Sequence, residues 1–188
     1  MAQRATLVLG SALLLLPGAA TAGESFPSVE AAGVWLMSYY QHPQPERLPE
    51  LLDAWGQHVR SDSLETVPPV AQFIAEVIRR EPTSCAESLY RAGKRNGNWQ
   101  TKNLALEALW HADTDTSRRL LRQAASEWKD HQLAEEAGDM LRNPPRRLAE
   151  IGGAPGSQDR WWTAFYATGE RQWVEQVAKD PFDGRPLP

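Results

Sequence analysis

Hydrophobic residues recur every three to four positions along most of the chain, and short polar or proline-containing segments separate these runs. In the first run, Ala32, Trp35, Leu36, Tyr39 and Tyr40 would share one face of a helix. The same spacing predicts further helices near residues 48–59, 70–81, 84–93, 98–112, 117–128, 133–141, 145–151, 157–167 and 173–178. No segment alternates apolar and polar residues for long, as a half-buried strand would. The pattern therefore predicts an all-α protein.

Several residues are of the kinds that begin or end helices. The predicted N-caps are Ser28, Asn98 and Ser157. Ser84 and Glu87 have the spacing of a capping box, which would begin the fourth helix at Ser84. Gly93 is expected to end that helix.

The short turns between these helices predict antiparallel neighbours. Taken in pairs, the helical hairpins begin near residues 28, 68, 99, 130 and 158, and the later spacings approach the period of helical-repeat proteins. The pairs do not resemble one another in sequence, and the tetratricopeptide consensus is absent. The sequence is compatible with an irregular solenoid of the TPR or HEAT kind and with a closed helical bundle. The solenoid is favoured, because each predicted hairpin connects only to its neighbour.

The beginning of the chain has the features of a secretory signal peptide, predicted over residues 1–22. Arg4 precedes an apolar run at residues 5–16, and Ala20-Thr21-Ala22 fits the signal peptidase, so cleavage is expected before Gly23. The alternative is a retained membrane anchor, but the apolar run is shorter than the roughly 20 residues that span a bilayer. No cysteine near the cleavage site offers a lipid anchor, and no later stretch is apolar enough to span. We expect a periplasmic or secreted protein with one helical domain at 23–179 and a flexible proline-rich tail at 180–188.

The net charge limits the kinds of binding partner, and the cysteine content limits the possible disulfides. The formal net charge is −4, and loss of Arg4 with the leader makes it more negative. An acidic chain is a poor partner for nucleic acid, because phosphate binding needs a basic face. Cys85 is the only cysteine, so no internal disulfide can form. A buried thiol is the favoured interpretation, while a thiolate near the start of a helix and an intermolecular disulfide are alternatives.

The sequence offers no motif for a metal, a nucleotide or a nucleophile. The histidines, His42, His58, His111 and His131, do not lie three or four residues apart. Residues 113–117 resemble the start of a calcium loop, but Arg118 occupies the position where that loop requires glycine. No phosphate loop and no nucleophile elbow is present. The prediction is a protein with no metal, no cofactor and no nucleophilic catalytic residue.

Glu107 is the one carboxylate with a candidate catalytic role. It lies among the apolar residues of segment 104–110, and such surroundings raise the pKa of a glutamate that serves as a general acid. A hydrolase of envelope polysaccharide with Glu107 as its acid is therefore one alternative. Glu107 pointing to solvent from a polar stripe is the other.

Eight tryptophans are the unusual feature of the composition. Five lie on helix faces predicted to be buried: Trp35, Trp55, Trp110, Trp128 and Trp173. Adjacent side chains on a helix diverge by about 100 degrees, so Trp161 and Trp162 do not fit one narrow seam together. One of this pair, with Trp99 or Tyr166 nearby, is expected to form an exposed aromatic patch. The predicted binding residues are Trp99, Trp161, Trp162 and Tyr166.

Three segments resemble an uncharacterised family of exported bacterial helical proteins. They are residues 161–177, with an aromatic run followed by Ala-Thr-Gly-Glu, residues 39–49 with Tyr-Tyr-Gln-His-Pro, and residues 73–77. The resemblance covers about a third of the chain. It implies an all-helical, exported bacterial protein and carries over no catalytic residue.

These patterns predict an exported helical module that binds another protein. Hairpin arrays present grooves that hold peptides or partner helices. The alternatives are the polysaccharide hydrolase with Glu107 and an immunity protein that neutralises a secreted toxin.

Overall fold

The computed structural model describes residues 25–58, 67–152 and 156–179, and over these residues the fold is helical with no strand. The predicted all-α class is confirmed. The predicted signal peptide and the proline-rich tail lie outside the described residues. The helices are α1 (Val29–Ser38), α2 (Leu48–His58), α3 (Val67–Arg80), α4 (Pro82–Arg95), α5 (Trp99–Ala112), α6 (Asp115–Glu127), α7 (His131–Arg142), α8 (Ser157–Thr168) and α9 (Arg171–Lys179). Short 3₁₀ turns are η1 (Tyr39–Gln41), η2 (Pro45–Arg47) and η4 (Leu148–Glu150).

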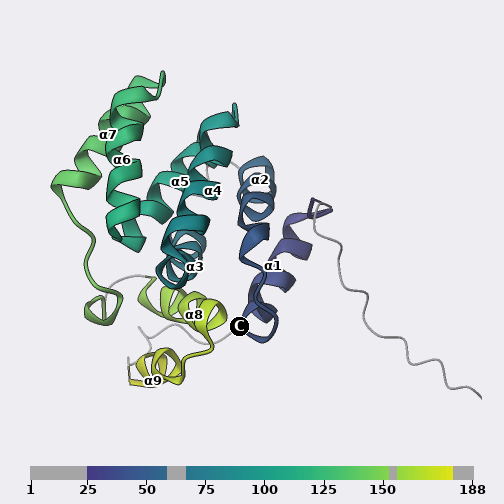
Figure 1. The fold of residues 1–188 in the computed structure, drawn as a ribbon. Coiled ribbons are helices and arrows are strands. Elements are labelled where there is room, and N and C mark those ends of the chain that lie inside the picture. Colours follow the sequence, from purple (N-terminus) through teal and green to yellow (C-terminus); the bar gives the residue numbers. More distant parts are fainter. Residues whose placement is uncertain (1–24, 59–66, 153–155, 180–188) are drawn as a thin grey trace, which may run out of the picture.

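Helix α3 lies at the centre of this arrangement and contacts α4, α5 and α8 (Figure 1). Its residues Val70 to Ile78 are almost all buried, because neighbours cover it on several sides. Helices α6 and α7 form a hairpin on one side of the molecule. Helix α8 returns to the N-terminal part and packs on α1, η1 and α3. The two ends of the described chain are thereby brought together.

Two apolar clusters hold the helices in place. The larger one includes buried residues from α1 to α8, and the half-buried rings of Trp35, Trp55, Trp99 and Trp110 pack against it. The smaller one consists of Leu148, Ile151, Trp161 and Ala164, with Trp173 and Val177 packed on it. The five tryptophans predicted to pack between helices do so, since each lies in or against one of these clusters.

The predicted helix ends are partly correct. Ser28 accepts a hydrogen bond from the amide of Ala31, and Asn98 accepts one from Gln100, so both N-caps are confirmed. The N-cap of α8 is Gly156, not Ser157: its φ of 75° lies in the left-handed region that glycine tolerates.

Helix α4 differs from its prediction at both ends. The helix begins at Pro82, which suits the first helical position because it lacks an amide hydrogen. Ser84 is therefore inside the helix, and no capping box forms there. Gly93 does not end the helix, which continues to Arg95. A Cβ at Gly93 would lie 2.8 Å from the Cβ of Ala105, so this glycine allows α4 and α5 to approach closely.

The helix predicted at 145–151 is reduced to the single turn η4. The carbonyl of Leu148 in this turn accepts a hydrogen bond from the buried indole of Trp161 at 3.0 Å, which ties the segment to α8. Among the described residues, no helix combines the length and the apolar character that crossing a bilayer requires.

Candidate functional site

An apolar surface with four aromatic rings lies where α1 and η1 meet α8. Val34, Met37, Tyr40 and Trp162 are the exposed large hydrophobic side chains of the described residues. The rings of Tyr40 and Phe165 join the two helices, with centroids 5.0 Å apart. Trp162 contacts Phe165 and stacks on Tyr166, with centroids 6.2 and 6.1 Å apart. We call the surface formed by Val34, Met37, Tyr40, Trp162, Phe165 and Tyr166 the aromatic surface.

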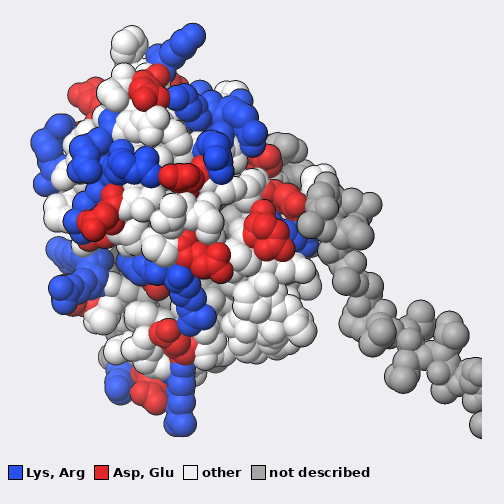
Figure 2. Space-filling model, in the orientation of Figure 1, with Lys and Arg blue, Asp and Glu red and all other residues white. Residues whose placement is uncertain are grey.

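The segments that form the aromatic surface carry no charge. Residues 31–45 and 161–169 contain no Asp, Glu, Lys or Arg, although these residues make up 23% of the chain. Figure 2 shows the result as a broad uncharged area over α1 and η1, at the lower right. Lys and Arg gather instead over α4 and α6. Exposed apolar side chains without a charged neighbour in sequence are typical of a contact region, because isolated monomers rarely expose large apolar patches.

Only part of the aromatic surface was predicted from sequence. Trp162, which is 37% exposed, and Tyr166 belong to it. Val34, Met37, Tyr40 and Phe165 were missed. The signal that could have found them is the absence of charge from two segments, one near each end of the described chain.

Trp161 cannot contribute to a surface. Its side chain is only 2% exposed and lies in the smaller apolar cluster. Its indole nitrogen donates to the carbonyl of Leu148. The side chains of Trp161 and Trp162 diverge as expected, since Trp161 points inward and Trp162 points outward. The prediction of Trp161 itself as a binding residue is wrong.

Trp99 lies far from the aromatic surface. It begins α5 beside the end of α2, where the Asn98 amide donates to the carbonyl of Gly56 at 2.6 Å. Figure 1 shows this end of α5 at the top of the molecule and α8 near the bottom. The Trp99 ring is half-buried against the larger cluster. The structure therefore separates Trp99 from Trp162 and Tyr166.

Glu107 and His111 form a polar pair on α5, one helical turn apart. His111 is buried, and its Nε2 lies 3.7 Å from Glu107 Oε2, which is longer than a hydrogen bond. Burial, with the nearby Glu136, raises the pKa of the Glu107 carboxyl. Burial, with the cations of Arg160 and Arg79, lowers the pKa of His111 to about 3. The Glu107 carboxyl is thus largely buried beside polar and charged groups, and it is not directed wholly to solvent.

The lowered pKa of His111 predicts acid sensitivity. In the unfolded chain the imidazole takes up a proton near pH 6.5, whereas in the folded chain it does so only near pH 3. Between these values the unfolded state binds more protons, so stability falls as the pH falls. We expect a loss of about 2 kcal/mol between pH 7 and pH 5, measured by urea unfolding. His111→Gln should remove most of this slope.

His42→Gln is the matched control, because His42 lies at the exposed end of η1. Its slope should equal that of the wild type. The raised pKa of Glu107 acts in the opposite sense, since that carboxyl binds its proton more readily when folded. If His111→Gln left the slope of the wild type unchanged, the burial of neutral His111 would be contradicted.

An ion pair near the C-terminal end of α3 holds the end of α5. Glu76 is buried, and its Oε1 accepts hydrogen bonds from Gln72 at 2.7 Å and from Arg79. Arg79 also donates to the carbonyls of His111 and Ala112 in the last turn of α5. A cation at this position satisfies carbonyls that no helical amide reaches and complements the helix dipole.

Loss of the Arg79 guanidinium should therefore destabilise the fold. Arg79→Met leaves Glu76 without its counter-ion and two carbonyls without a donor. Breaking a buried pair typically costs 3–5 kcal/mol, and the Arg79 side chain is 35% exposed, so we expect about 2 kcal/mol in urea unfolding. Arg80→Met is the control on the same helix. Both partners of the Arg80–Glu170 pair are about half exposed, so that change should cost less than about 1 kcal/mol. Equal effects of the two changes would contradict the role of Arg79.

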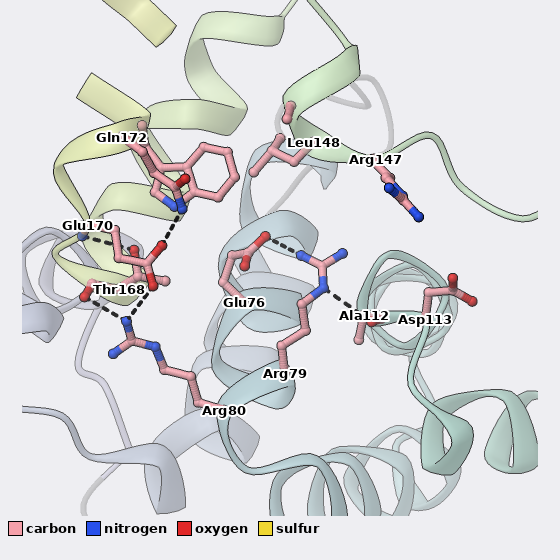
Figure 3. Close-up of a pocket in the computed structure, with 12 residues that line it drawn as sticks. Glu76, Arg79, Arg80, Ala112, Asp113, Arg147, Leu148, Thr168, Glu170 and Gln172 are labelled. Atoms are coloured by element: carbon pink, nitrogen blue, oxygen red, sulfur yellow. Dashed lines mark hydrogen bonds and ion pairs between the residues drawn. The ribbon is translucent and has the colours of Figure 1, made fainter. Parts of the chain in front are cut away.

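A cavity of about 510 Å³ opens beside this ion pair. Residues from α3, the end of α5, the η4 segment and the turn between α8 and α9 line it (Figure 3). Figure 3 shows Glu76 and Arg79 pointing from α3 toward Leu148 and Gln172, with Arg147 on one side. None of the predicted site residues lines this cavity.

Cys85 is a free, buried thiol near the start of α4. Burial raises its pKa, so the thiolate expected near a helix start is disfavoured. The favoured interpretation of a buried side chain is confirmed. Among the described residues, no group of three or more His, Cys, Asp and Glu side chains is placed to hold a metal ion.

Comparison of the chain with protein-family models, with curated proteins and with solved structures found no match.

Proposed function

We propose that this chain is an exported helical protein that binds another protein through the aromatic surface. The observation that carries the proposal is the meeting of two uncharged segments, 31–45 and 161–169, whose exposed large side chains are apolar. Aromatic side chains and methionine are enriched at protein interfaces, and tryptophan and tyrosine often contribute most of the binding energy. Export is inferred from the leader pattern at residues 1–22.

The occupant that fits this surface best is an amphipathic helix of the partner. Val34, Met37 and Tyr40 follow one another at three-residue spacing along α1 and η1, and α8 packs beside them. A partner helix lying along this row would place its apolar residues against both elements. The absence of charge in the row favours an apolar contact over an ionic one. The negative net charge of the chain and the apolar character of the surface disfavour nucleic acid as the partner.

The arrangement of hairpins is inferred to be irregular. In a regular solenoid each hairpin contacts only its neighbours. Here α8 contacts α1 and α3 as well as α9. We therefore favour an irregular array closed by α8 over a repeat of the TPR or HEAT kind.

Photo-crosslinking tests the proposal in cells that make the protein. A benzophenone amino acid at position 162 should crosslink to a specific envelope protein. The same group at position 122, which is exposed on α6, should not. The crosslinked segment of the partner should be an amphipathic helix. Crosslinks between two copies of this chain, or the same products from both positions, would contradict the proposal.

A second candidate function rests on Glu107. Burial raises the pKa of the Glu107 carboxyl, as the general acid of a hydrolase requires. Purified protein would then release soluble fragments from isolated cell wall, and Glu107→Gln would abolish the release. If the wild-type protein releases no fragments, this candidate is excluded.

A further inference from the structure

The cavity between α3, α5 and the η4 segment is a junction of distant parts of the chain. Glu76, Ala112, Leu148 and Thr168 contribute to it from four separate elements. Its volume of about 510 Å³ is in the range of pockets that hold small molecules. It is separate from the aromatic surface, because none of the six residues of that surface lines it.

Most charged groups of the cavity are already paired. Arg79 is held by Glu76 and by the two carbonyls of α5. Arg80 donates to the carbonyl of Thr168 at 2.9 Å and to Glu170 at 3.1 Å. These interactions hold both arginine side chains in place at the wall of the cavity.

Two groups of opposite charge keep free capacity. Both hydrogen bonds to Glu76 end on Oε1, and Oε2 has no partner among the described residues. The guanidinium of Arg147 makes no hydrogen bond or ion pair with any residue that the structure describes, and it lies on the opposite side of the space from Glu170 in Figure 3. Glu76 Oε2 can accept from a donor or cation that enters the cavity, and the exposed guanidinium of Arg147 can donate to an oxyanion.

Part of the remaining wall of the cavity is apolar and consists of Leu148, Ala112 and the Trp173 ring. Gln172 and the buried indole nitrogen of Trp173, which has no partner among the described residues, are polar. A ligand that satisfies all three features carries a cation, an oxyanion and an apolar group. We propose that the cavity binds a small zwitterion of the α-amino-acid type. Its ammonium group lies at Glu76 Oε2, its carboxylate at Arg147, and its side chain against Leu148 and Trp173.

The indole N–H signal of Trp173 in a ¹H–¹⁵N spectrum reports on this cavity, and its loss in Trp173→Phe assigns it. Pools of the proteinogenic amino acids at about 10 mM, above a weak Kd of about 1 mM, are the probes. At least one amino acid should shift the signal saturably. Its amide, which lacks the carboxylate, and its N-acetyl form, which lacks the ammonium, should bind at least tenfold more weakly.

Substitutions test whether the amino acid binds in this cavity or elsewhere on the protein. Arg147→Gln should weaken binding at least tenfold, and Arg146→Gln, one residue earlier and outside this cavity, should leave it unchanged. Glu76→Gln should also weaken binding, provided its circular dichroism spectrum matches that of the wild type. The proposal is overturned if no amino acid shifts the signal. It is also overturned if the amide or N-acetyl form binds as well, or if Arg147→Gln binds normally.

Discussion

Replacement of Trp161 by alanine is expected to lower the free energy of unfolding by about 4 kcal/mol. The side chain is only 2% exposed and fills the smaller apolar cluster with Leu148, Ile151 and Ala164. Truncation of a buried tryptophan typically costs 3–5 kcal/mol, because the lost contacts leave a cavity. The change also leaves the Leu148 carbonyl without its indole donor. Urea unfolding followed by circular dichroism measures the effect.

The neighbouring Trp162→Ala is the matched control for stability. It removes an equally large side chain from an exposed position, so it should cost less than about 1 kcal/mol. The two changes therefore separate a structural role from a binding role on adjacent residues. If Trp162→Ala were as destabilising as Trp161→Ala, the opposite orientations of the two rings would be wrong.

Gly56→Ala is expected to destabilise the fold by about 3 kcal/mol. Gly56 is buried in α2 where this helix packs on α5. A Cβ there would lie 1.6 Å from the hydroxyl oxygen of Thr101 and 3.0 Å from its Cα. The backbone of α5 would have to move, and overpacking of this kind costs about 1–3 kcal/mol or more. The helix propensity of alanine recovers only about 1 kcal/mol.

Gly33→Ala tests the same substitution at a helix position that has open space beside it. Gly33 lies inside α1, and nothing comes within 4 Å of an added Cβ. This change should therefore increase the free energy of unfolding by about 0.5–1 kcal/mol. The opposite signs at positions 33 and 56, measured in the same urea series, distinguish close packing from propensity. Two changes of the same sign would contradict the close approach of α2 and α5.

The helices could be predicted from sequence because their apolar spacing reports burial directly. Val70, Phe73, Ile74, Val77 and Ile78 are predicted on one face, and all are buried in α3. Helix ends were less predictable, since several residues compete for the same role. At α4 the prolyl ring of Pro82 takes the first helical position ahead of Ser84. At Gly93 the close approach of α5, and not a helix end, explains the glycine.

The candidate site was less predictable than the fold. The periodic pattern shows that Trp161 and Trp162 point in different directions, but only packing decides which one is buried. The return of α8 to α1 joins residues more than a hundred positions apart, and no local pattern reports such a contact. The cavity beside Glu76 depends on the same return, because the turn between α8 and α9 forms one of its walls. Contacts between residues far apart in sequence therefore form both the aromatic surface and the cavity beside Glu76.

The affinity of the purified protein for the partner crosslinked at position 162 tests the central claim most directly. Isothermal titration should show that Trp162→Ala binds at least tenfold more weakly than the wild type, a loss of about 1.4 kcal/mol or more. Arg122→Ala, on the exposed face of α6, should bind as the wild type does. Wild-type affinity in Trp162→Ala, or an equal loss in Arg122→Ala, would contradict the assignment of the aromatic surface as a protein-binding site.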